Sequence, residues 1–348
     1  MSAQSMVMWG GLALGVVFGV LAQATAFCLT GGLREWWSEN RMRRIGGFAL
    51  ALAVAILATQ FLAIVGLIEP ARSLYLQASF SWLLVPLGGV LFGYGMMLAR
   101  GCGARALVLL GEGNLRSLVV LLCLGIAAHA AMGGVLAPVR VAVAEATTIS
   151  FATPPGLAEW LASVGLAETL ARLIPALLLG GLLILIALRI AHLHRARAEL
   201  IAVAAIGLVI AGGWFLTGHL AADDFDPAPV QSLSFIAPVG DAIQYLMLAT
   251  GMRVDFGVAV VAGVLAGAFL AALLRGRLEL RGFEKPAQLV RAMLGGVLMG
   301  IGGVLALGCS IGQGLSGLST LALSSFLAAA GILLGARLTV RGPLKLAD

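Results

Sequence analysis

Charged residues are scarce in this sequence. Only 11% of its 348 residues are Asp, Glu, Lys or Arg, whereas 61% are hydrophobic and the mean hydropathy is +1.05. A soluble globular domain carries about 25% charged residues, so the composition excludes a soluble domain. The sequence therefore predicts an all-α polytopic membrane protein with the lipid bilayer as its surroundings.

Several other signals are missing. The first residues contain no basic segment and the first apolar run is too long for a signal peptide, so we expect a retained transmembrane helix. The sequence has no Cys-x-x-Cys motif, and its four cysteines lie within or at the ends of apolar segments, which argues against a disulfide framework. The four histidines share no ligand spacing with the cysteines, so we expect no metal or other cofactor.

The positive charge does not indicate a nucleic acid or a nucleotide. The formal net charge is +6, but the basic residues form short clusters between apolar runs, which is typical of cytoplasmic loops. Gly312 and Gly314 lack the adjoining Lys and Ser or Thr of a phosphate-binding loop and follow no predicted strand. We expect no nucleic-acid partner.

Nine apolar segments are long enough to cross a bilayer, since a spanning helix needs about 20 mostly apolar residues. They cover residues 6–27, 45–68, 81–99, 116–137, 170–190, 200–220, 254–274, 289–307 and 319–340. With the N-terminus outside, the acidic run at 223–226 is external and the C-terminus is cytoplasmic. The positive-inside rule favours this orientation, because nearly all basic residues then fall on the cytoplasmic side. The exceptions are Arg72, Arg140, Arg172 and Arg253.

A glycine-rich segment occurs twice in what we expect to be a single membrane domain over residues 1–348. Gly-Gly-Val-Leu at 88–91 and Gly-Cys at 101–102 recur at 295–298 and 308–309, at a constant offset of 207 residues. The sequence therefore predicts repeat-related segments at 88–122 and 295–329. Five crossings separate them, so they should be antiparallel, as in the inverted repeats of many transporters.

A weaker likeness, between 15–19 and 263–267, pairs two helices that the same crossing count makes parallel. Either it reflects ordinary glycine-rich helix packing, which we favour, or the crossing count is wrong by one.

Three connections are too apolar to be ordinary loops. They are residues 102–114, residues 309–318 and residues 233–250, the last interrupted by Pro238. Irregular backbone at membrane depth needs protein or a polar cavity to satisfy its N–H and C=O groups. We expect broken or re-entrant helices in all three.

Two of the cysteines follow the repeated helices directly. Gly101 and Gly103 flank Cys102, and Gly308 precedes Cys309. Glycine leaves a neighbouring thiol open to a ligand and lets backbone N–H groups turn towards it. If a helix restarts after Cys102 or Cys309, its N-terminus also favours an anion. A thiol beside an anion site suits an anion with a soft sulfur end.

The other two cysteines carry less information. Cys28 has no repeat partner, so spacing alone leaves its role open. Cys123 stands in an apolar run, and we interpret it as a small packing residue.

Polar residues near the cysteines are further candidates. Ser310, Gln313, Ser316 and Thr320 could donate hydrogen bonds to an oxyanion, although Ser316 and Thr320 could equally join helices. Arg100 and Arg105 flank Cys102 and could attract an anion or anchor the topology. Glu112 lies in an apolar connection, where a charge costs several kcal/mol unless paired. We expect its partner to be Arg100, Arg105 or Arg116. His129 lies in a helix interior, as a packing residue or a proton relay.

These motifs resemble the YeeE/YedE family of bacterial inner-membrane proteins that transport sulfur compounds. The likeness rests on Phe-Cys-Leu-Thr-Gly-Gly at 27–32, Arg-Gly-Cys at 100–102 with Gly-Glu-Gly at 111–113, and Gly-Cys-Ser-Ile-Gly-Gln-Gly at 308–314. Motif order and spacing agree from about residue 10 to residue 335. The resemblance brings Thr30, in the first motif, into the candidate site.

The resemblance implies about nine membrane helices plus short re-entrant ones in an hourglass-like body. The family's thiosulfate transporters are thought to pass the anion along three cysteines through transient S–H···S hydrogen bonds. By motif position these would be Cys28, Cys102 and Cys309. A small cytoplasmic sulfur-carrier protein of the TusA type is an implied partner.

The leading hypothesis is an inner-membrane importer of a small sulfur-containing oxyanion, with thiosulfate as the favoured substrate. Burial keeps a thiol protonated, so it can donate to the anion without adding a repulsive charge. One alternative is a transporter of selenium or other sulfur compounds. Another is a membrane thiol oxidoreductase or sulfurtransferase, against which the missing Cys-x-x-Cys motif argues. An assembly subunit without transport fits the interior glycines and cysteines poorly.

Overall fold

The computed structural model describes residues 3–190, 197–220 and 229–341. The predicted external acidic run at 223–226 lies outside these ranges. Within them, nine helices are long and apolar enough to cross a membrane, which confirms the predicted all-α membrane class. They are α1 (Ala3–Thr25), α3 (Arg43–Ile64), α4 (Leu84–Leu98), α6 (Leu115–Met132), α9 (Glu168–Leu185), α10 (Arg197–Phe215), α12 (Phe256–Leu274), α13 (Pro286–Leu305) and α14 (Leu323–Arg341). Helix α4 reaches spanning length only together with the short helix α5 that follows it, over Leu84–Gly111.

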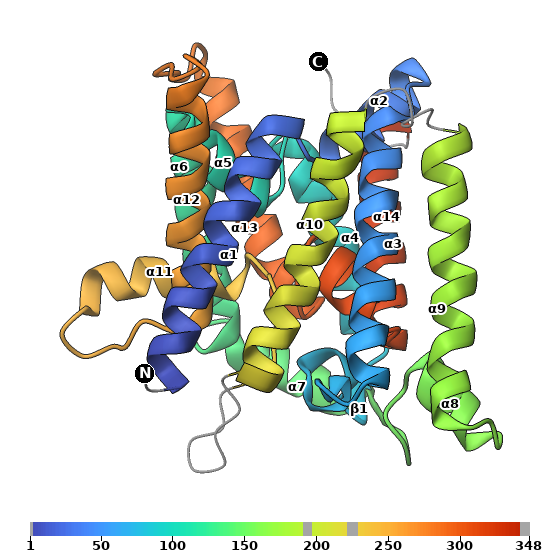
Figure 1. Cartoon of the computed structure of the whole chain (residues 1–348). Coiled ribbons are helices and arrows are strands. Elements are labelled where there is room, and N and C mark those ends of the chain that lie inside the picture. The colour runs from blue at the N-terminus through green and yellow to red at the C-terminus, as the bar shows by residue number, and fades with distance from the viewer. Residues whose placement is uncertain (1–2, 191–196, 221–228, 342–348) are drawn as a thin grey trace.

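Short elements connect or extend these helices (Figure 1). The short α-helices are α2 (Leu29–Glu39), α5 (Gly103–Gly111), α7 (Ala137–Thr147), α8 (Leu157–Ser163) and α11 (Ala237–Leu248). Two 3-10 turns, η1 (Pro70–Arg72) and η2 (Leu74–Leu76), precede β1 (Ser79–Ser81), which pairs antiparallel with β2 (Thr148–Ser150). Three π-helical turns are η3 (Ile186–Ile190), η5 (Leu216–Leu220) and η6 (Gly312–Gly317).

Helices α4 and α13 form the centre of the bundle. A methyl group on Gly88 would lie 2.7 Å from the carbonyl oxygen of Gly302, and one on Gly95 would lie 2.8 Å from that of Gly295. Such approach is open only to glycine, since any side chain would overlap the facing backbone. Gly88 near the start of α4 thus meets Gly302 near the end of α13, and Gly95 meets Gly295, so the two helices are antiparallel.

The helices that pack on α4 and α13 are related by the same antiparallel symmetry. Helix α4 also packs on α14, and α13 packs on α6. Gly89 faces Gly331 of α14, while Gly296 faces Leu124 of α6. These contacts are those expected of an inverted repeat. An origin of 88–122 and 295–329 by duplication stays a prediction.

The weaker likeness between 15–19 and 263–267 lies at the contact of α1 with α12. Gly15 faces Gly263 there, and Gly19 faces Ala268 four to five residues further along each helix. The two helices therefore run parallel, as the crossing count requires. This supports packing as the origin of the likeness.

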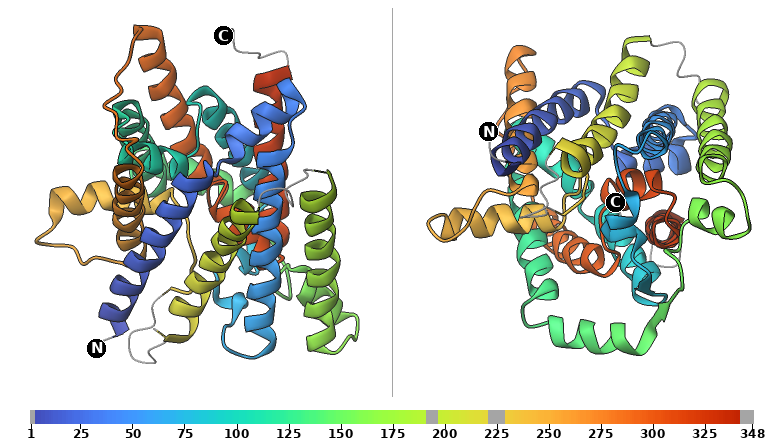
Figure 2. Two further views of the ribbon diagram at one scale, coloured as in Figure 1. Left: turned by 45° about the horizontal axis from the view of Figure 1, so that its top comes forward. Right: turned by 60° about the horizontal axis from the view of Figure 1, so that its bottom comes forward.

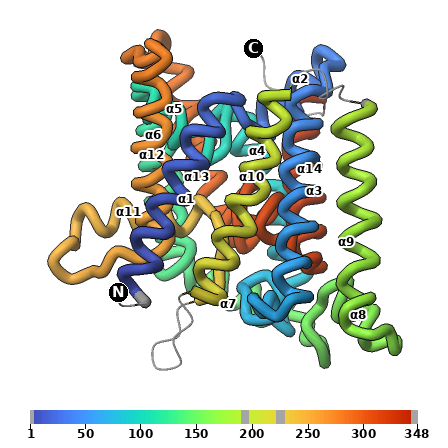
Figure 3. The backbone as a smooth tube through the Cα atoms, in the orientation of Figure 1, coloured from blue at the N-terminus to red at the C-terminus, as the bar shows by residue number. Residues whose placement is uncertain are grey.

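Each of the three apolar connections contains a short helical segment. Helix α5 packs among α1, α6 and α12, and η6 packs among α3, α10 and α14. In the third, an extended stretch with the buried residues Leu233 and Phe235 leads to α11, which projects from the bundle (Figure 3). Helix α9 stands at the edge of the molecule (Figure 2) and exposes Leu177 and Leu178, as a lipid-facing helix does.

The two ends of the bundle differ in charge. One end carries α2 and the C-terminal end of α14, and two cavities there are lined by arginines. These are Arg41, Arg43, Arg44 and Arg275 in one cavity and Arg34, Arg100, Arg291 and Arg341 in the other. We call this end the arginine-rich face. The opposite end carries the start of α1 and the β1–β2 sheet, and we call it the sheet face (Figure 1).

Candidate functional site

The same backbone turn precedes three of the four cysteines. Two residues before each of these cysteines, a residue other than glycine adopts a left-handed conformation: Ala26 with φ of 49°, Arg100 with 60° and Leu307 with 59°. The residue after it donates its N–H to the carbonyl five residues earlier, over 2.8–3.0 Å. This is the Schellman arrangement that ends an α-helix. Three helices thus end in the same way, immediately before Cys28, Cys102 and Cys309.

A new helical segment begins after each turn. Cys28 is the N-cap of α2, Cys102 is the N-cap of α5, and η6 starts three residues after Cys309. The N–H of Gly31 donates to Cys28 Sγ at 3.4 Å, and that of Gly312 donates to Cys309 Sγ at 3.2 Å. The three thiols therefore lie among backbone N–H groups that helix starts leave without intrahelical partners.

The corresponding group at Cys102 is the N–H of Arg105. It faces the thiol but forms no cap hydrogen bond with it. The helix starts after Cys102 and Cys309 were expected from the sequence, whereas α2 was missed. Residues 29–39 lie between the predicted spans 6–27 and 45–68, and nothing in the sequence indicated a helix there.

The fourth cysteine has different surroundings. Cys28, Cys102 and Cys309 are all buried and free, whereas Cys123 is half-buried on α6. Cys123 Cβ would lie 2.8 Å from a methyl group on Gly296, so it packs against α13. This position agrees with its interpretation as a packing residue.

Cys28 and Cys102 line one small cavity, together with Phe18, Phe27 and Arg105. Its volume of about 10 Å³ has room for about one water molecule. Arg105 Nη1 is buried and has no hydrogen-bond partner in the described part of the chain. A buried guanidinium N–H beside two thiols is an uncompensated donor that an anion would satisfy.

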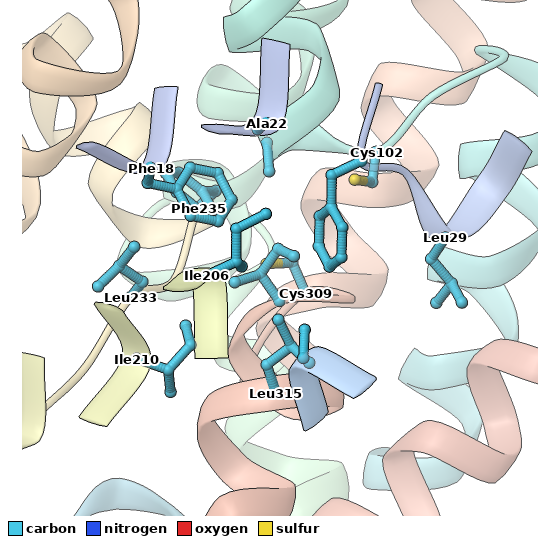
Figure 4. Packing of buried hydrophobic residues seen from close by; sticks show 14 of the residues in the cluster. Phe18, Ala22, Leu29, Cys102, Ile206, Ile210, Leu233, Phe235, Cys309 and Leu315 are labelled. Carbon is cyan, nitrogen blue, oxygen red and sulfur yellow. The ribbon is translucent and has the colours of Figure 1, made fainter. Parts of the chain in front are cut away.

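Cys102 and Cys309 belong to one packed cluster, in which Ala22, Phe18 and Phe235 lie near them (Figure 4). Ser310, which follows Cys309, lies beside the Cys102 thiol. Its buried hydroxyl is also without a hydrogen-bond partner among the described residues. Some of the hydrogen-bond donors near the thiols therefore have no acceptor among the described residues.

The surroundings of Cys309 come from two segments distant in sequence. Backbone N–H groups of Ile311, Gly312 and Phe235 and the Ser234 hydroxyl lie around its thiol. The stretch that carries Ser234 and Phe235 is tied to η6 by a hydrogen bond of 2.7 Å from Ser316 Oγ to the Leu233 carbonyl.

The other predicted polar residues near Cys309 mostly hold the fold. Gln313 Nε2 donates to the Ala306 carbonyl at the end of α13 (2.5 Å), which leaves Gln313 Oε1 buried without a hydrogen-bond donor from the described residues. Thr320 Oγ1 donates to the carbonyl of Gly317 (2.7 Å). Ser316 thus joins two separate segments, as in the alternative to oxyanion binding, whereas the Thr320 bond is local and joins no two helices.

Arg100 and Arg105 point to different places. Arg100 is exposed and lines the second arginine-rich cavity, of about 620 Å³, which Thr30 and Gly31 border. The first cavity, of about 960 Å³, is bordered by residues 24–26, just before Cys28. Both cavities therefore adjoin the segment that carries Cys28. Each is lined by more arginines than glutamates, so they attract anions.

The predicted partners of Glu112 are wrong. Its carboxylate lies near Arg281, whereas Arg116 pairs with Glu284 at 3.0 Å. The backbone carbonyl of Glu112 accepts a hydrogen bond from the N–H of Glu279 (3.1 Å). Helix α5 ends at this point, and Glu112 is only half-buried, so it does not require a buried partner.

Two further expectations concern groups outside the cysteine site. His129 Nε2 lies 3.4 Å from Asp241 Oδ1, so the histidine links α6 to α11 and does not face the thiols. Within the described ranges, no group of three or more His, Cys, Asp or Glu residues is placed to hold a metal ion. The chemistry available at the site is that of thiols, hydroxyls, N–H groups and one buried arginine.

Comparison with known proteins gives consistent matches over nearly the whole chain. A family model described as Sulphur transport matches residues 24–338, which include all three cysteine turns. The thiosulfate transporter TsuA of Escherichia coli K12 is 28% identical over 322 residues, which cover 88% of this chain and 86% of that protein. The thiosulfate transporter TsuA of Spirochaeta thermophila is 28% identical over 341 residues, 94% of this chain and 97% of that protein.

Proposed function

The chain belongs to the sulphur transport family, the YeeE/YedE family that its motifs resemble, and from this premise we propose that it imports thiosulfate across the bacterial inner membrane. Both relatives named above are thiosulfate transporters, which supports a sulfur oxyanion as the cargo. The proposal is transport without covalent chemistry on the anion.

The observation that carries the proposal is the buried N–H of Arg105 beside the cavity of Cys28 and Cys102. Thiosulfate has negatively charged oxygens and a soft terminal sulfur. A guanidinium donates hydrogen bonds to the charged oxygens, and a neutral thiol donates a weak hydrogen bond to the terminal sulfur. Sulfate offers no soft sulfur, so it would use only part of this site.

The anion would be handed along Cys28, Cys102 and Cys309 by S–H···S hydrogen bonds. Backbone N–H groups at the starts of α2 and α5 would replace part of its hydration shell, as in other transporters with broken helices. The cavity between Cys28 and Cys102 has room for about one water molecule, so side chains must move before an anion passes. In this proposal the path is closed between Cys28 and Cys102 until those side chains move.

The arginine-rich face is proposed to be cytoplasmic, with the N-terminus outside, because the positive-inside rule places arginines there. Its two cavities would hold the imported anion near Cys28. The same face offers a basic surface to a small sulfur-carrier protein of the TusA type.

Uptake of labelled thiosulfate into proteoliposomes tests the proposal, with sulfate, sulfite and selenite as competitors. We expect saturable uptake that sulfate inhibits weakly. Arg105→Met should raise KM about tenfold or more, because a charge-assisted hydrogen bond is lost, while Arg253→Met on the surface should leave KM unchanged. Preference for selenite would indicate a selenium transporter instead.

The enzymatic alternative is tested by mass spectrometry of the purified protein after exposure to thiosulfate. Unmodified thiols agree with transport. A stoichiometric persulfide or disulfide at Cys28, Cys102 or Cys309 would show a sulfurtransferase or oxidoreductase and overturn the proposed mechanism.

A further inference from the structure

Tyr75 lies on the side of Cys309 that faces the sheet face. It belongs to η2, between α3 and β1, yet its side chain is buried. A methyl group on Gly312 would lie 3.3 Å from Tyr75 Oη and 2.7 Å from Ser234 Oγ. Both hydroxyls therefore stand over the residue whose N–H donates to the Cys309 thiol. Sequence reasoning missed both, because neither is near a cysteine in the chain.

Three separate elements hold Tyr75 in this position. Ser324 Oγ of α14 donates to its carbonyl oxygen at 2.8 Å. Trp214 of α10 meets its ring edge-on, with ring centroids 6.1 Å apart. Ser73, two residues earlier, pairs with Val230 at the start of the extended stretch that carries Ser234. The backbone around Tyr75 is therefore held by two elements and its ring by a third.

A second buried hydroxyl lies along the same ring. A methyl group on Gly317 would lie 3.1 Å from Tyr75 Cδ1 and would overlap Ser325 Oγ. Ser325 is fully buried, and its hydroxyl has no hydrogen-bond partner among the described residues. Buried hydroxyls are normally satisfied, so an unpaired one requires an explanation such as a ligand that is bound only at times.

A polar cavity of about 380 Å³ opens near this place from the sheet face. It is lined by Glu69, Arg72, Arg172 and His219, and by Val230, the partner of Ser73. The extended stretch that begins at Val230 thus connects the lining of this cavity with Ser234, whose hydroxyl lies beside the Cys309 thiol.

We propose that Tyr75 and Ser234 bind the oxygens of the transported anion while Cys309 faces its terminal sulfur. Two kinds of donor at one place recognise the two ends of thiosulfate and set its orientation: hydroxyls for the hard oxygens and a thiol for the soft sulfur. Ser325 supplies a further donor along the Tyr75 ring. Tyr75 is the specificity-determining residue on the sheet-face side, as Arg105 is near Cys28 and Cys102. This inference rests on the proposed function.

The test is the kinetics of thiosulfate uptake into proteoliposomes by Tyr75→Phe, which removes the hydroxyl and keeps the ring. We expect KM to rise about tenfold or more, the usual effect of losing a hydrogen bond to a charged group, with Vmax changed less than about twofold. Ser234→Ala should raise KM in the same direction. Tyr245→Phe on α11 is the matched control and should behave as wild type. Thermal stability of all variants should stay close to wild type, because each substitution removes one hydroxyl oxygen and keeps the carbon atoms of the side chain.

A KM for Tyr75→Phe within about twofold of the wild-type value would overturn the inference. So would a fall in Vmax with unchanged KM, since that indicates a structural or gating role rather than anion binding. If the wild-type protein takes up no thiosulfate at all, the proposed function is wrong and this inference falls with it.

Discussion

At the scale of the residue, the site consists of small donors presented by strained backbone. Ala26, Arg100 and Leu307 adopt a left-handed conformation that costs about 1 kcal/mol or more in a residue other than glycine. Each turn brings a buried thiol next to backbone N–H groups. The same arrangement at three places is the basis for proposing one function for Cys28, Cys102 and Cys309.

The three thiols should be individually required. Replacing Cys28, Cys102 or Cys309 by serine keeps the volume nearly constant but removes the soft donor. We expect thiosulfate uptake to fall at least about tenfold in each variant, in line with the loss of a specific contact. The measurement is initial uptake rate in proteoliposomes.

Cys123→Ser on α6 provides the control and should retain the wild-type rate. Unchanged uptake in both Cys102→Ser and Cys309→Ser would contradict a role for the thiols.

At the scale of the element, helices α4 and α13 pack backbone against backbone, with no side chain between them. Gly88, Gly95, Gly295 and Gly302 allow the backbones of α4 and α13 to touch, with the end of α4 at Ala99 beside Gly295 and the end of α13 at Ala306 beside Gly88. In a bilayer such packing, rather than a hydrophobic driving force, holds helices together.

One glycine of this contact makes the point testable. A methyl group on Gly302 would lie 2.5 Å from the Phe92 nitrogen and 2.7 Å from the Gly88 carbonyl oxygen. We expect Gly302→Ala to cost about 1–3 kcal/mol or more through overpacking. Thermal unfolding in detergent measures the effect.

Gly181→Ala on α9 is the matched control, because nothing lies within 4 Å of the added methyl group. It should leave stability unchanged or raise it by about 0.4–1 kcal/mol. Equal behaviour of the two variants would show that the α4–α13 contact is not close.

The junction of α8 and α9 should respond to pH. Arg172 Nη2 lies 3.4 Å from Glu159 Oε1, and each side chain is 12% exposed. Burial raises the pKa of Glu159, and Arg172 only partly offsets this effect. A raised folded-state pKa means that the stabilisation by protonated Glu159 is present at low pH and is lost as pH rises through that pKa.

Melting temperatures measured against pH should therefore show a component that Glu159→Gln removes. Arg172→Gln should destabilise by about 3 kcal/mol near neutral pH, since it leaves a buried carboxylate with no counter-charge. A pH profile of Glu159→Gln identical to wild type would contradict this assignment.

At the scale of the whole molecule, the two ends have distinct chemistry. The arginine-rich face holds two large cavities beside the Cys28 segment, and the sheet face presents a smaller cavity near Tyr75. The three cysteines lie between them. In the proposed function, an anion would bind at each end and pass by the cysteines between them.

The orientation of these faces in the membrane can be measured. Ser38 of α2 is exposed on the arginine-rich face, and Ser163 of α8 is exposed at the sheet face. In a Cys123→Ala background, we expect a membrane-impermeant maleimide to label intact spheroplasts carrying Ser163→Cys and not those carrying Ser38→Cys. Labelling of both after lysis is the control, and the reverse pattern would invert the proposed topology.

Composition and motif spacing were enough to predict much of this protein. Nine spans, the three broken segments and the cysteines that begin new helices after Gly-Cys all follow from apolar length and glycine placement, which act locally along the chain. The start of α2 at Leu29 did not follow, because Ala26 gives no local sign of its left-handed backbone. The partner of Glu112 was wrong because the path of α5 back to the surface depends on its packing among α1, α6 and α12.

The sequence by itself determined the membrane class, the family and which cysteines are site candidates. Each of these depends on hydropathy or on residues close together in the chain. Only the tertiary structure decided that Arg105 lies in the cavity with Cys28 and that Tyr75 and Ser234 stand over Gly312. These groups come from helices and loops separated by many residues. Their meeting depends on how these segments pack in three dimensions, and residues far apart in the chain leave no local sequence pattern that identifies their packing partners.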